Sequence, residues 1–507
     1  MRIRVVTDQP WEVAADVLVV PVIGEARFEG SLGELYRRSG GELRALVAFG
    51  EIRTKRFTTA LTAPGELPSS RVLTVAIGTE PVDHEVVHRA AAAVERRLGG
   101  RHAVSVAVWL TPLADALGVR AAGEPLATVA KLVVRGIVEG SFDPKALYRD
   151  DAEGIPPALD ELTLVAPGGD AQMLEAAAQQ GAIIGEGANL ARSLSNRAAN
   201  EISPQILADE AAAIAKQLDL SIEVIDERRA AELGMNLFLA VGRGSDNPPR
   251  MIVLRSGGDA ERDQLGRHLA LIGKGVCFDS GGISLKPPDR MEEMKMDKTG
   301  ACTVLAAIAT VSRLAPGTPL LAVAPAVENM PGPHSTRPGD VVKALNGKWV
   351  DIVNTDAEGR LILGDAITYA ERLGATHLVD VATLTGAVSR ALGHLVTGAF
   401  GNDDGWYGEL EAAASRAGER YWRIPLVKDL FPDMDSWYAD FTNTGTPEGS
   451  LVKSGLFLDQ FATVPWIHLD IGGTGYYRKV QPFAARGSSG VTHATLVELA
   501  LAGARSG

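Results

Sequence analysis

The chain has 507 residues, which is more than one ordinary hydrophobic core holds, so two domains are expected. Its 46% hydrophobic and 22% charged residues are typical of a globular protein, and its two cysteines, Cys277 and Cys302, exclude a disulfide framework and a cysteine-rich zinc site. The net charge of −13 argues against nucleic-acid binding over the whole surface, and no segment has the pattern of a signal peptide or a membrane span, so a cytoplasmic location and no membrane partner are expected.

The first part of the chain alternates short apolar runs with helical patterns. Strands are predicted at residues 17–22, 71–77, 103–110 and 161–165, and helices at 84–98 and 125–138. Alternating strands and helices predict a smaller N-terminal α/β domain over residues 1–168, with a largely parallel sheet.

A long alanine-rich helical pattern at residues 171–195 follows, and it predicts a linker helix within residues 169–196. Residues 197–507 then repeat the α/β pattern. The predicted strands are 221–225, 251–254, 268–272, 320–324, 349–353, 377–381 and 466–471, and the predicted helices are 299–312, 360–372 and 454–461. We expect a larger C-terminal α/β catalytic domain with a central mixed sheet flanked by helices.

Charge is unevenly divided between these two parts. Residues 1–150 hold 19 Lys and Arg against 18 Asp and Glu, so the remainder carries −14. A carboxylate-rich second part fits the binding of hard metal ions, although it fits a merely acidic surface equally well.

Three segments place charged side chains just beyond predicted strands, where ligand sites lie in open α/β sheets. They are residues 273–286, 294–297 and 354–360. In the third segment Asp356 and Glu358 are two residues apart, a spacing that in extended backbone points both side chains to the same side. Two like charges so close need a cation, and magnesium, manganese or zinc accepts carboxylate oxygens. The alternative is an exposed acidic turn before a helix, and the spacing alone gives it equal weight.

The first segment adds Lys274 and Lys286 around Asp279. Lys274 is followed by Gly275, so the phosphate-binding pattern Gly-x4-Gly-Lys-Ser/Thr fails. A lysine beside a metal ion would instead lose its proton and bind as a neutral amine. His-Glu-x-x-His and a Gly-x-Ser-x-Gly that opens a helix after a strand are both missing, and none of the nine histidines lies in the three segments. A metal site here must therefore use Asp, Glu and Lys.

At these residues the sequence closely resembles the leucyl aminopeptidase family. Residues 354–361, Asn-Thr-Asp-Ala-Glu-Gly-Arg-Leu, reproduce the family's signature octapeptide, and residues 273–275, 278–282 and 294–297 match its other blocks in order and spacing. Residues 328–331, 337–340 and 382–387 match further stretches. The resemblance covers roughly residues 170–500 and is faint in the first part. It departs from the family at Lys298-Thr299, where a methionine and a small residue are usual, and at residues 196–200, which lack an expected proline.

The resemblance implies a role for each matched position. It implies a tighter-binding metal ion held by Lys274, Asp279, Asp297 and Glu358, and a second, exchangeable ion held by Asp279, Glu358 and the side chain and carbonyl of Asp356. It also implies that Lys286 polarises the substrate carbonyl and that Arg360 anchors a bicarbonate acting as general base. Substrate contacts are implied for Asn354, Leu384 and Gly386, and a pocket for the first side chain at Met294 and Thr383.

The resemblance therefore implies a metal-dependent aminopeptidase with two divalent ions, manganese or zinc, in each subunit of a homohexamer. It would release leucine and other apolar residues from peptides that have a free N-terminus. A phosphoesterase would need histidine ligands that the motifs lack. A DNA- or partner-binding protein that keeps the aminopeptidase fold is the alternative, and the net charge argues against the DNA-binding form.

Overall fold

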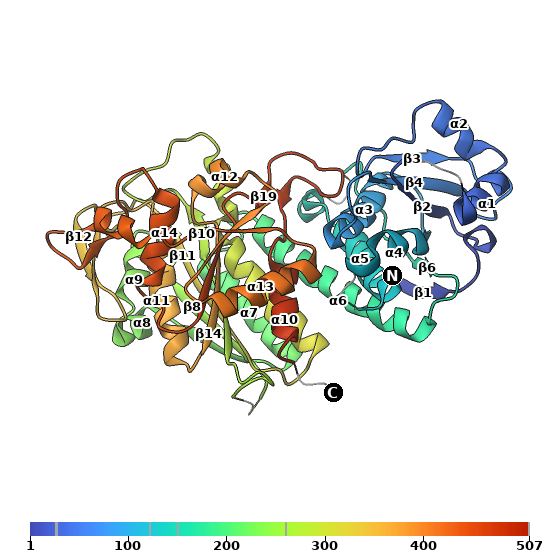
Figure 1. Cartoon of the computed structure of the whole chain (residues 1–507). Coiled ribbons are helices and arrows are strands. Elements are labelled where there is room, and N and C mark those ends of the chain that lie inside the picture. Colours follow the sequence, from blue (N-terminus) through green and yellow to red (C-terminus); the bar gives the residue numbers. More distant parts are fainter. Residues whose placement is uncertain (26–28, 121–122, 150–151, 259–260, 505–507) are drawn as a thin grey trace. The chain divides into compact units, whose positions relative to one another are not determined.

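The computed structural model of the chain describes residues 1–25, 29–120, 123–149, 152–258 and 261–504. The chain forms two compact units (Figure 1). The first contains Met1–Asn189, Arg416–Gly418 and Arg478–Arg486, and the second contains the rest. The expected two-domain organisation is confirmed, and the division falls inside α6 (Ala171–Asn196), which contributes residues to both units.

The first unit is built on a six-stranded sheet in the order β1-β6-β5-β2-β4-β3. Its strands are β1 (Arg2–Val6), β2 (Val17–Ile23), β3 (Thr59–Thr62), β4 (Arg71–Gly78), β5 (Ser105–Trp109) and β6 (Glu161–Val165). Only the edge strand β3 runs antiparallel to its neighbour, which confirms the largely parallel sheet. Its helices are α1 (Gly30–Arg38), α2 (Glu42–Ala48), α3 (His84–Arg97), α4 (Thr111–Leu117) and α5 (Pro125–Gly140), with 3₁₀ turns η1 (Pro10–Glu12), η2 (Gly118–Arg120) and η3 (Pro144–Leu147).

The sequence of β2 explains why it lies at the centre of this sheet. Its residues VLVVPVI are buried on both faces except the last, as expected for an interior strand of a parallel sheet. Helix α3 begins where the Asp83 carboxylate accepts a hydrogen bond from the Val86 N–H at 2.9 Å. The small alanines of α3 allow α5 to pack closely, since a Cβ on Gly136 would lie 2.3 Å from the His88 carbonyl oxygen.

The second unit contains a nine-stranded sheet in the order β16-β15-β18-β14-β9-β11-β8-β7, with β10 also paired to β11. Its strands are β7 (Ser221–Ile225), β8 (Arg250–Ser256), β9 (Leu269–Gly273), β10 (Gly275–Asp279), β11 (Leu320–Asn329), β14 (His377–Ala382), β15 (Thr397–Gly401), β16 (Tyr421–Arg423) and β18 (Trp466–Asp470). The central strands β18, β14, β9 and β11 are parallel. Strand β8 runs antiparallel to β11 and β7, and β15 runs antiparallel to β18 but parallel to β16. The mixed sheet expected for this part is confirmed.

Helices flank this sheet on both sides (Figure 1). Helix α10 packs on β9, β11 and β14 and also contacts α15. Helix α11 packs on the same three strands and also contacts α9 and α14. The helices of this unit, besides the end of α6, are α7 (Pro204–Leu218), α8 (Glu227–Leu233), α9 (Asn236–Gly242), α10 (Thr299–Leu314), α11 (Gly359–Arg372), α12 (Gly386–Leu392), α13 (Asp404–Ala417), α14 (Ser450–Asp459) and α15 (His493–Leu501), with 3₁₀ segments η4 (Met291–Lys298) and η5 (Lys428–Met434). Two small sheets join β12 (Asp340–Lys343), β13 (Trp349–Ile352) and β17 (Phe441–Thr442), and β19 (Tyr476–Tyr477) and β20 (Gly487–Ser488).

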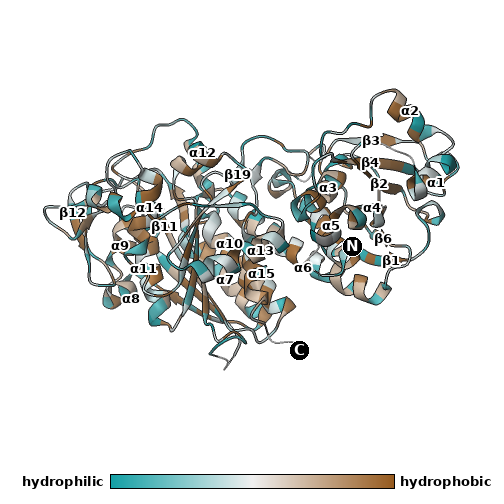
Figure 2. Ribbon diagram, viewed as in Figure 1, coloured by the Kyte–Doolittle hydropathy of each residue, from teal (hydrophilic) through white to brown (hydrophobic). Residues whose placement is uncertain are grey.

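Figure 2 shows the apolar strands of both large sheets between helices that turn their polar faces outward. All ten residues of β11 are buried, because helices cover both of its faces. None of the helices within the described ranges combines the length and apolarity that a membrane-crossing segment requires.

The predicted elements agree with the structure to within two residues at each end, with two exceptions. The strand predicted at residues 320–324 continues to Asn329, and the helix predicted at 454–461 is α14, which begins four residues earlier. Residues 275–279, for which no strand was predicted, form β10; Gly275 and Asp279 flank only three apolar residues, too few to give a strand pattern.

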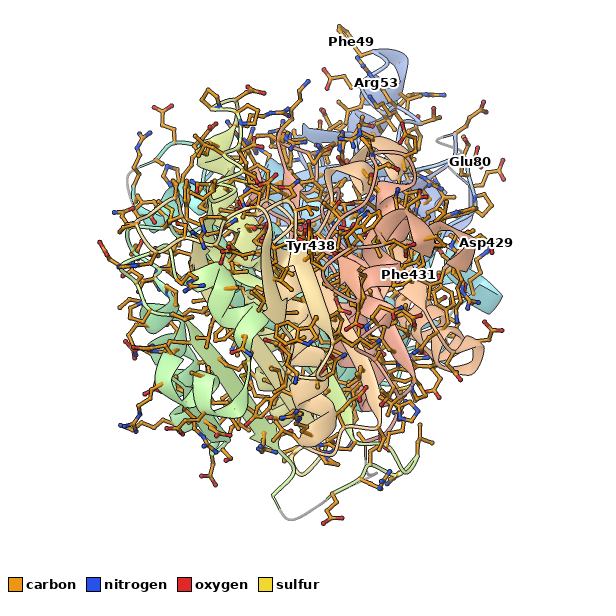
Figure 3. The ribbon with its side chains drawn as sticks, turned by 90° about the vertical axis from the view of Figure 1, so that its left-hand side faces the viewer. Phe49, Arg53, Glu80, Asp429, Phe431 and Tyr438 are labelled. Atoms are coloured by element: carbon orange, nitrogen blue, oxygen red, sulfur yellow. The ribbon has the colours of Figure 1, made fainter. Side chains whose placement is uncertain are left out.

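Large aromatic side chains also remain on the surface of the second unit. Trp437 is 98% exposed and Tyr438 is 82% exposed. Figure 3 shows Tyr438 on the face turned toward the viewer. Backbone hydrogen bonding joins this segment to β13, where the Asp440 N–H donates to the Trp349 carbonyl oxygen at 3.1 Å.

Candidate metal centre

The charged residues singled out in the sequence gather at the carboxyl ends of the parallel strands. Lys274 directly follows β9, Asp279 ends β10, Asn329 ends β11 and Thr383 follows β14. Because β9 pairs in parallel with both β11 and β14, these strand ends meet at one edge of the sheet. This is the edge where open α/β sheets bind ligands.

Lys274 lies at the centre of one half of the cluster. Its Nζ is 2.8 Å from Asp297 Oδ2 and 2.7 Å from Glu358 Oε1. It also donates a hydrogen bond to the Thr383 carbonyl oxygen at 3.1 Å. The side chain is buried, so this nitrogen is fixed between two carboxylates from distant segments.

Lys286 occupies the other half. Its Nζ lies 2.7 Å from Asp279 Oδ2 and also forms an ion pair with Asp356. Unlike Lys274, the Lys286 side chain is partly open to solvent. A cation that faces both the carboxylates and the outside is placed to meet an incoming molecule.

Three carboxylates come close enough to share one cation. Ligand oxygens of Asp279, Asp356 and Glu358 all lie within 4.8 Å of one another. With Asp297, the cluster holds four carboxylates against two lysines, an excess of two negative charges. This donor set fits divalent ions that accept oxygen ligands, with Lys274 Nζ available as a nitrogen ligand once it has lost its proton.

The convergence of Asp356 and Glu358 does not arise in the expected way. Asp356 lies in a turn, where its N–H donates to Asn354 Oδ1 at 2.9 Å, and Glu358 has helical angles (φ −77°, ψ −36°) just before α11. The expectation of extended backbone was therefore wrong. The turn and the start of the helix bring the two carboxylates together instead.

Asp297 is placed by the short segment η4 and the helix that follows it. The start of α10 approaches the end of β9 closely, since a Cβ on Gly273 would lie 2.3 Å from the Gly300 carbonyl oxygen. The neighbouring Lys298, where the family usually has a methionine, is fully buried and donates to the carbonyl oxygens of Arg197 (2.9 Å) and Lys295. Lys298 thus ties the segment carrying Asp297 to the chain after α6.

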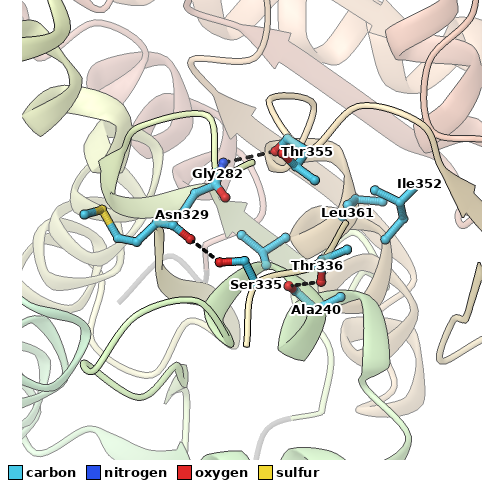
Figure 4. A pocket seen from close by; sticks show the side chains of 10 residues that line it. Ala240, Gly282, Asn329, Ser335, Thr336, Ile352, Thr355 and Leu361 are labelled. Carbon is cyan, nitrogen blue, oxygen red and sulfur yellow. Dashed lines mark hydrogen bonds between the residues drawn. The ribbon is translucent and has the colours of Figure 1, made fainter. Parts of the chain in front are cut away.

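A polar framework supports the carboxylates from behind. Asn329 Nδ2 donates to Asp279 Oδ1 at 2.8 Å and to the Thr355 carbonyl oxygen at 3.0 Å, and Figure 4 shows Asn329, Gly282 and Thr355 around one pocket. Gly282 has φ +68°, and a Cβ there would lie 2.7 Å from Asn329 Oδ1. Glycine is required at this position for both reasons.

Burial and mutual repulsion alter how the carboxyl groups titrate. Burial, together with the charges of Glu358 and Asp297, raises the pKa of Asp279 well above its ordinary value. Burial raises the pKa of Asp356 to about 6 against the opposing charge of Lys286. Burial alone would lower the pKa of Lys274, but the nearby charges of Asp297 and Glu358 outweigh it and raise that pKa. Without a bound cation, Asp279 and Asp356 therefore keep their protons to a higher pH than ordinary aspartates do.

The residues expected to contact substrate lie around this cluster. Thr383 Oγ1 donates to Asp297 Oδ1 at 2.6 Å, and the Asn354 carbonyl oxygen accepts from Asn443 Nδ2 at 2.7 Å. Met294 lies on η4, three residues before Asp297. Gly386 is exposed at the first residue of α12.

Arg360 is the second residue of α11 and is buried. Its Nη1 donates to the Asn443 carbonyl oxygen at 3.1 Å, and burial lowers the pKa of its guanidinium to about 10. Asn443 thus connects Arg360, through its backbone carbonyl, to Asn354, through its side-chain amide.

Asn329, Asn443 and Asp470 are further residues of the site for which no role was predicted from the sequence. Asp470 accepts hydrogen bonds from Leu384 N–H (3.2 Å) and from the Thr385 hydroxyl (2.7 Å), so it holds the turn that precedes Gly386. Asn329 and Asp470 each end a parallel strand, and the strand-end rule that selected Asp279 would have selected both. Asn443 follows the two-residue strand β17, which is too short to give a pattern.

Comparison with known proteins points in one direction. The catalytic-domain profile of the cytosol aminopeptidase family matches residues 189–497, and its N-terminal-domain profile matches residues 19–147. A probable cytosol aminopeptidase of Solibacter usitatus (strain Ellin6076) is 40% identical over 505 residues, which cover 99% of each chain. One from Geobacter sp. (strain M21) is 37% identical over 505 residues, covering 98% of this chain and 99% of that protein.

Solved structures show the same likeness in three dimensions. A mutant of tomato leucine aminopeptidase superposes with a TM-score of 0.85 at 30% identity, covering 99% of this chain and 96% of that one. The bottromycin maturation enzyme BotP in complex with Mn superposes with a TM-score of 0.81 at 32% identity, covering 96% of this chain and 99% of that one. The likeness extends over both units of the chain.

Proposed function

The chain belongs to the cytosol aminopeptidase family and is a metal-dependent aminopeptidase, and from this premise we propose which residues do the work and on what substrate. The observation that carries the proposal is the convergence of Asp279, Asp356 and Glu358 within 4.8 Å, beside two lysines. No other group of three or more acidic, histidine or cysteine side chains with this spacing occurs among the described residues.

We propose that the cluster holds two divalent ions, manganese or zinc. Lys274, Asp279, Asp297 and Glu358 would hold one ion, and Asp279, Asp356 and Glu358 the other, so that Asp279 and Glu358 serve both. Such ions supply Lewis acidity, polarising a carbonyl and making water acidic enough to attack near neutral pH. The BotP complex with Mn supports manganese as a candidate.

Lys286 and Arg360 have separate tasks in this proposal. Lys286, fixed by Asp279 and Asp356 but partly exposed, donates a hydrogen bond to the carbonyl oxygen of the scissile bond as negative charge develops there. The buried guanidinium of Arg360 would hold a bicarbonate, which would supply a general base for the attacking water.

The remaining residues orient the substrate. Met294 and Thr383 line the pocket for the first side chain, and Asn354, Leu384 and Gly386 contact the peptide. The free α-amine would bind at the metal cluster, which explains the removal of one residue at a time. The pocket at Met294 and Thr383 would favour leucine and other apolar residues. The alternative of a DNA- or partner-binding protein that keeps the fold has no support in these comparisons.

We further propose that the enzyme works in the cytoplasm as a homohexamer. The exposed Trp437 and Tyr438, beside the half-exposed Trp349, form an aromatic surface of the kind that protein–protein contacts bury. Sedimentation of the purified chain tests this assembly, and a monomer at micromolar concentration would contradict it.

Substrate selectivity tests the proposed exopeptidase chemistry. Leucine p-nitroanilide should be cleaved in the presence of manganese or zinc, whereas its N-acetyl derivative should not, because the acetyl group removes the charge of the α-amine. Equal cleavage of both compounds would show that the free amine plays no part and would refute the proposal.

A further inference from the structure

Arg390 lies beside the proposed substrate turn, and the described residues provide no partner for its side chain. It is exposed on α12, four residues after Gly386, and therefore on the same side of the helix as Gly386. Its Nη1 lies 3.4 Å from the position that a Cβ on Gly386 would occupy. Within the described ranges no hydrogen bond, ion pair or ring contact involves the Arg390 side chain.

Two other arginines of the second unit have partners. Arg360 is buried against Asn443, and Arg423 on the surface pairs with Asp404. A guanidinium beside Gly386 for which the described residues show no partner has its charge available for a bound molecule. A guanidinium binds a carboxylate through two parallel hydrogen bonds, a geometry that a lysine ammonium does not offer.

The turn that leads to Arg390 gives the direction of the bound peptide. It starts at Thr383, whose carbonyl oxygen meets Lys274 Nζ and whose hydroxyl meets Asp297. Asp470 then holds Leu384 and Thr385 in place. If the first side chain of a peptide occupies the Thr383 end, the part beyond the scissile bond passes along the turn and reaches Gly386.

From this placement, and resting on the proposed function, we propose that Arg390 binds the C-terminal carboxylate of short peptides just beyond the scissile bond. The enzyme then favours dipeptides with a free carboxylate over the same peptides with a neutral end. Arg390 acts on substrate selection and takes no part in bond cleavage.

Paired substrates test this role. Leu-Ala and Leu-Ala-amide differ only in the charge at the C-terminus, and leucine p-nitroanilide has no carboxylate at all. The parent enzyme should show a higher kcat/KM for Leu-Ala than for the amide, and Arg390→Gln should lower that ratio about fivefold, as expected for one exposed ion pair. Arg390→Lys should keep part of the preference, because the charge remains.

The salt dependence of this kcat/KM ratio distinguishes a charge–charge contact with the substrate from a purely structural role of Arg390. Raising the ionic strength from about 0.05 M to about 0.5 M should reduce the ratio in the parent enzyme and leave it unchanged in Arg390→Gln. Arg228→Gln, on the exposed helix α8, is the matched control and should behave like the parent enzyme. A parent enzyme without preference, or a ratio unaltered in Arg390→Gln, would overturn the proposal.

Leucine p-nitroanilide separates this idea from the proposed function. If all variants cleave it equally and the ratio stays constant, only the role of Arg390 is lost. If the parent enzyme fails to cleave it with any metal, the proposed function itself fails.

Discussion

Replacing Glu95 with glutamine should stabilise the first unit strongly at pH 8 and hardly at all at pH 5. Glu95 lies on α3 and is fully buried, and neither of its carboxyl oxygens has a hydrogen-bond partner among the described residues. Helix α5 covers it, since a Cβ on Gly140 would lie 2.9 Å from Glu95 Cβ. Burial raises the pKa of Glu95 to about 8, and the nearby charge of Arg96 opposes this only in part.

The direction of the pH effect follows from where the proton is held. Between the ordinary pKa of 4.5 and the folded value of about 8, the unfolded chain releases the Glu95 proton while the folded chain keeps it. The stability linked to this proton is therefore fully present below pH 4.5 and is lost as pH rises to 8. The values differ by about 3.5 (8 − 4.5), and at about 1.4 kcal/mol for each pKa unit the loss is about 5 kcal/mol at pH 8 and less than about 1 kcal/mol at pH 5.

Hydrogen exchange of peptides from α3 and α5 measures this locally. Glutamine at position 95 has almost the same shape as glutamate but no charge to bury. The protection of α3 and α5 amides in Glu95→Gln, relative to the parent chain, should therefore rise steeply from pH 5 to pH 8. Glu80→Gln, at an exposed position labelled in Figure 3, is the control and should match the parent chain at both pH values. A difference between Glu95→Gln and the parent that is the same at both pH values would refute the reasoning.

Two substitutions test the proposed site directly. Glu358→Ala removes a carboxylate assigned to both ions and should lower kcat at least about 100-fold while circular dichroism stays native-like; retained turnover would refute the shared role. Lys286→Ala should lower kcat about 10²- to 10³-fold with little change in metal affinity measured by calorimetry, and an unchanged kcat would refute its assignment to the carbonyl oxygen.

The strands and helices of the core were predictable because their patterns are local. Strands such as β6 and β7 have the bounds that their apolar runs predict, and the long helix α6 follows its alanine-rich pattern. Strand β10 was missed because glycines and charged residues surround its three apolar residues. The residues around β10 belong to the candidate site, and such residues often depart from the secondary-structure preference of their segment.

Long-range placement could not be predicted in the same way. Residues 478–486 lie far along the chain yet belong to the first unit, where Phe483 packs edge-on against Phe57 with ring centroids 5.6 Å apart. The Arg89 guanidinium also lies 4.4 Å from the centre of the Phe483 ring. The sequence of residues 478–486 does not indicate these partners, because Phe57 and Arg89 lie far away along the chain.

The candidate site shows the same division. The charged residues of the signature segments could be selected from the sequence, because each follows a strand, and the structure brings Lys274, Asp279, Asp356 and Glu358 together. In the framework around them, Asn329 and Asp470 each end a strand and could have been selected by the same rule, whereas Asn443 follows a two-residue strand that gives no local pattern. The detailed path of the backbone at Asp356 and Glu358 also differs from the extended form that their spacing alone suggested.

Metal titration of the purified chain tests the central claim most directly. The chain is first treated with a chelator, and hydrolysis of leucine p-nitroanilide is then followed as manganese or zinc is added, with bound ions counted by elemental analysis. Activity should be absent after chelation, return as ions bind, and be complete at two ions per chain, whereas Glu358→Ala should bind fewer ions and stay inactive. Full activity in the metal-free chain, or activity that does not follow the number of bound ions, would contradict the account.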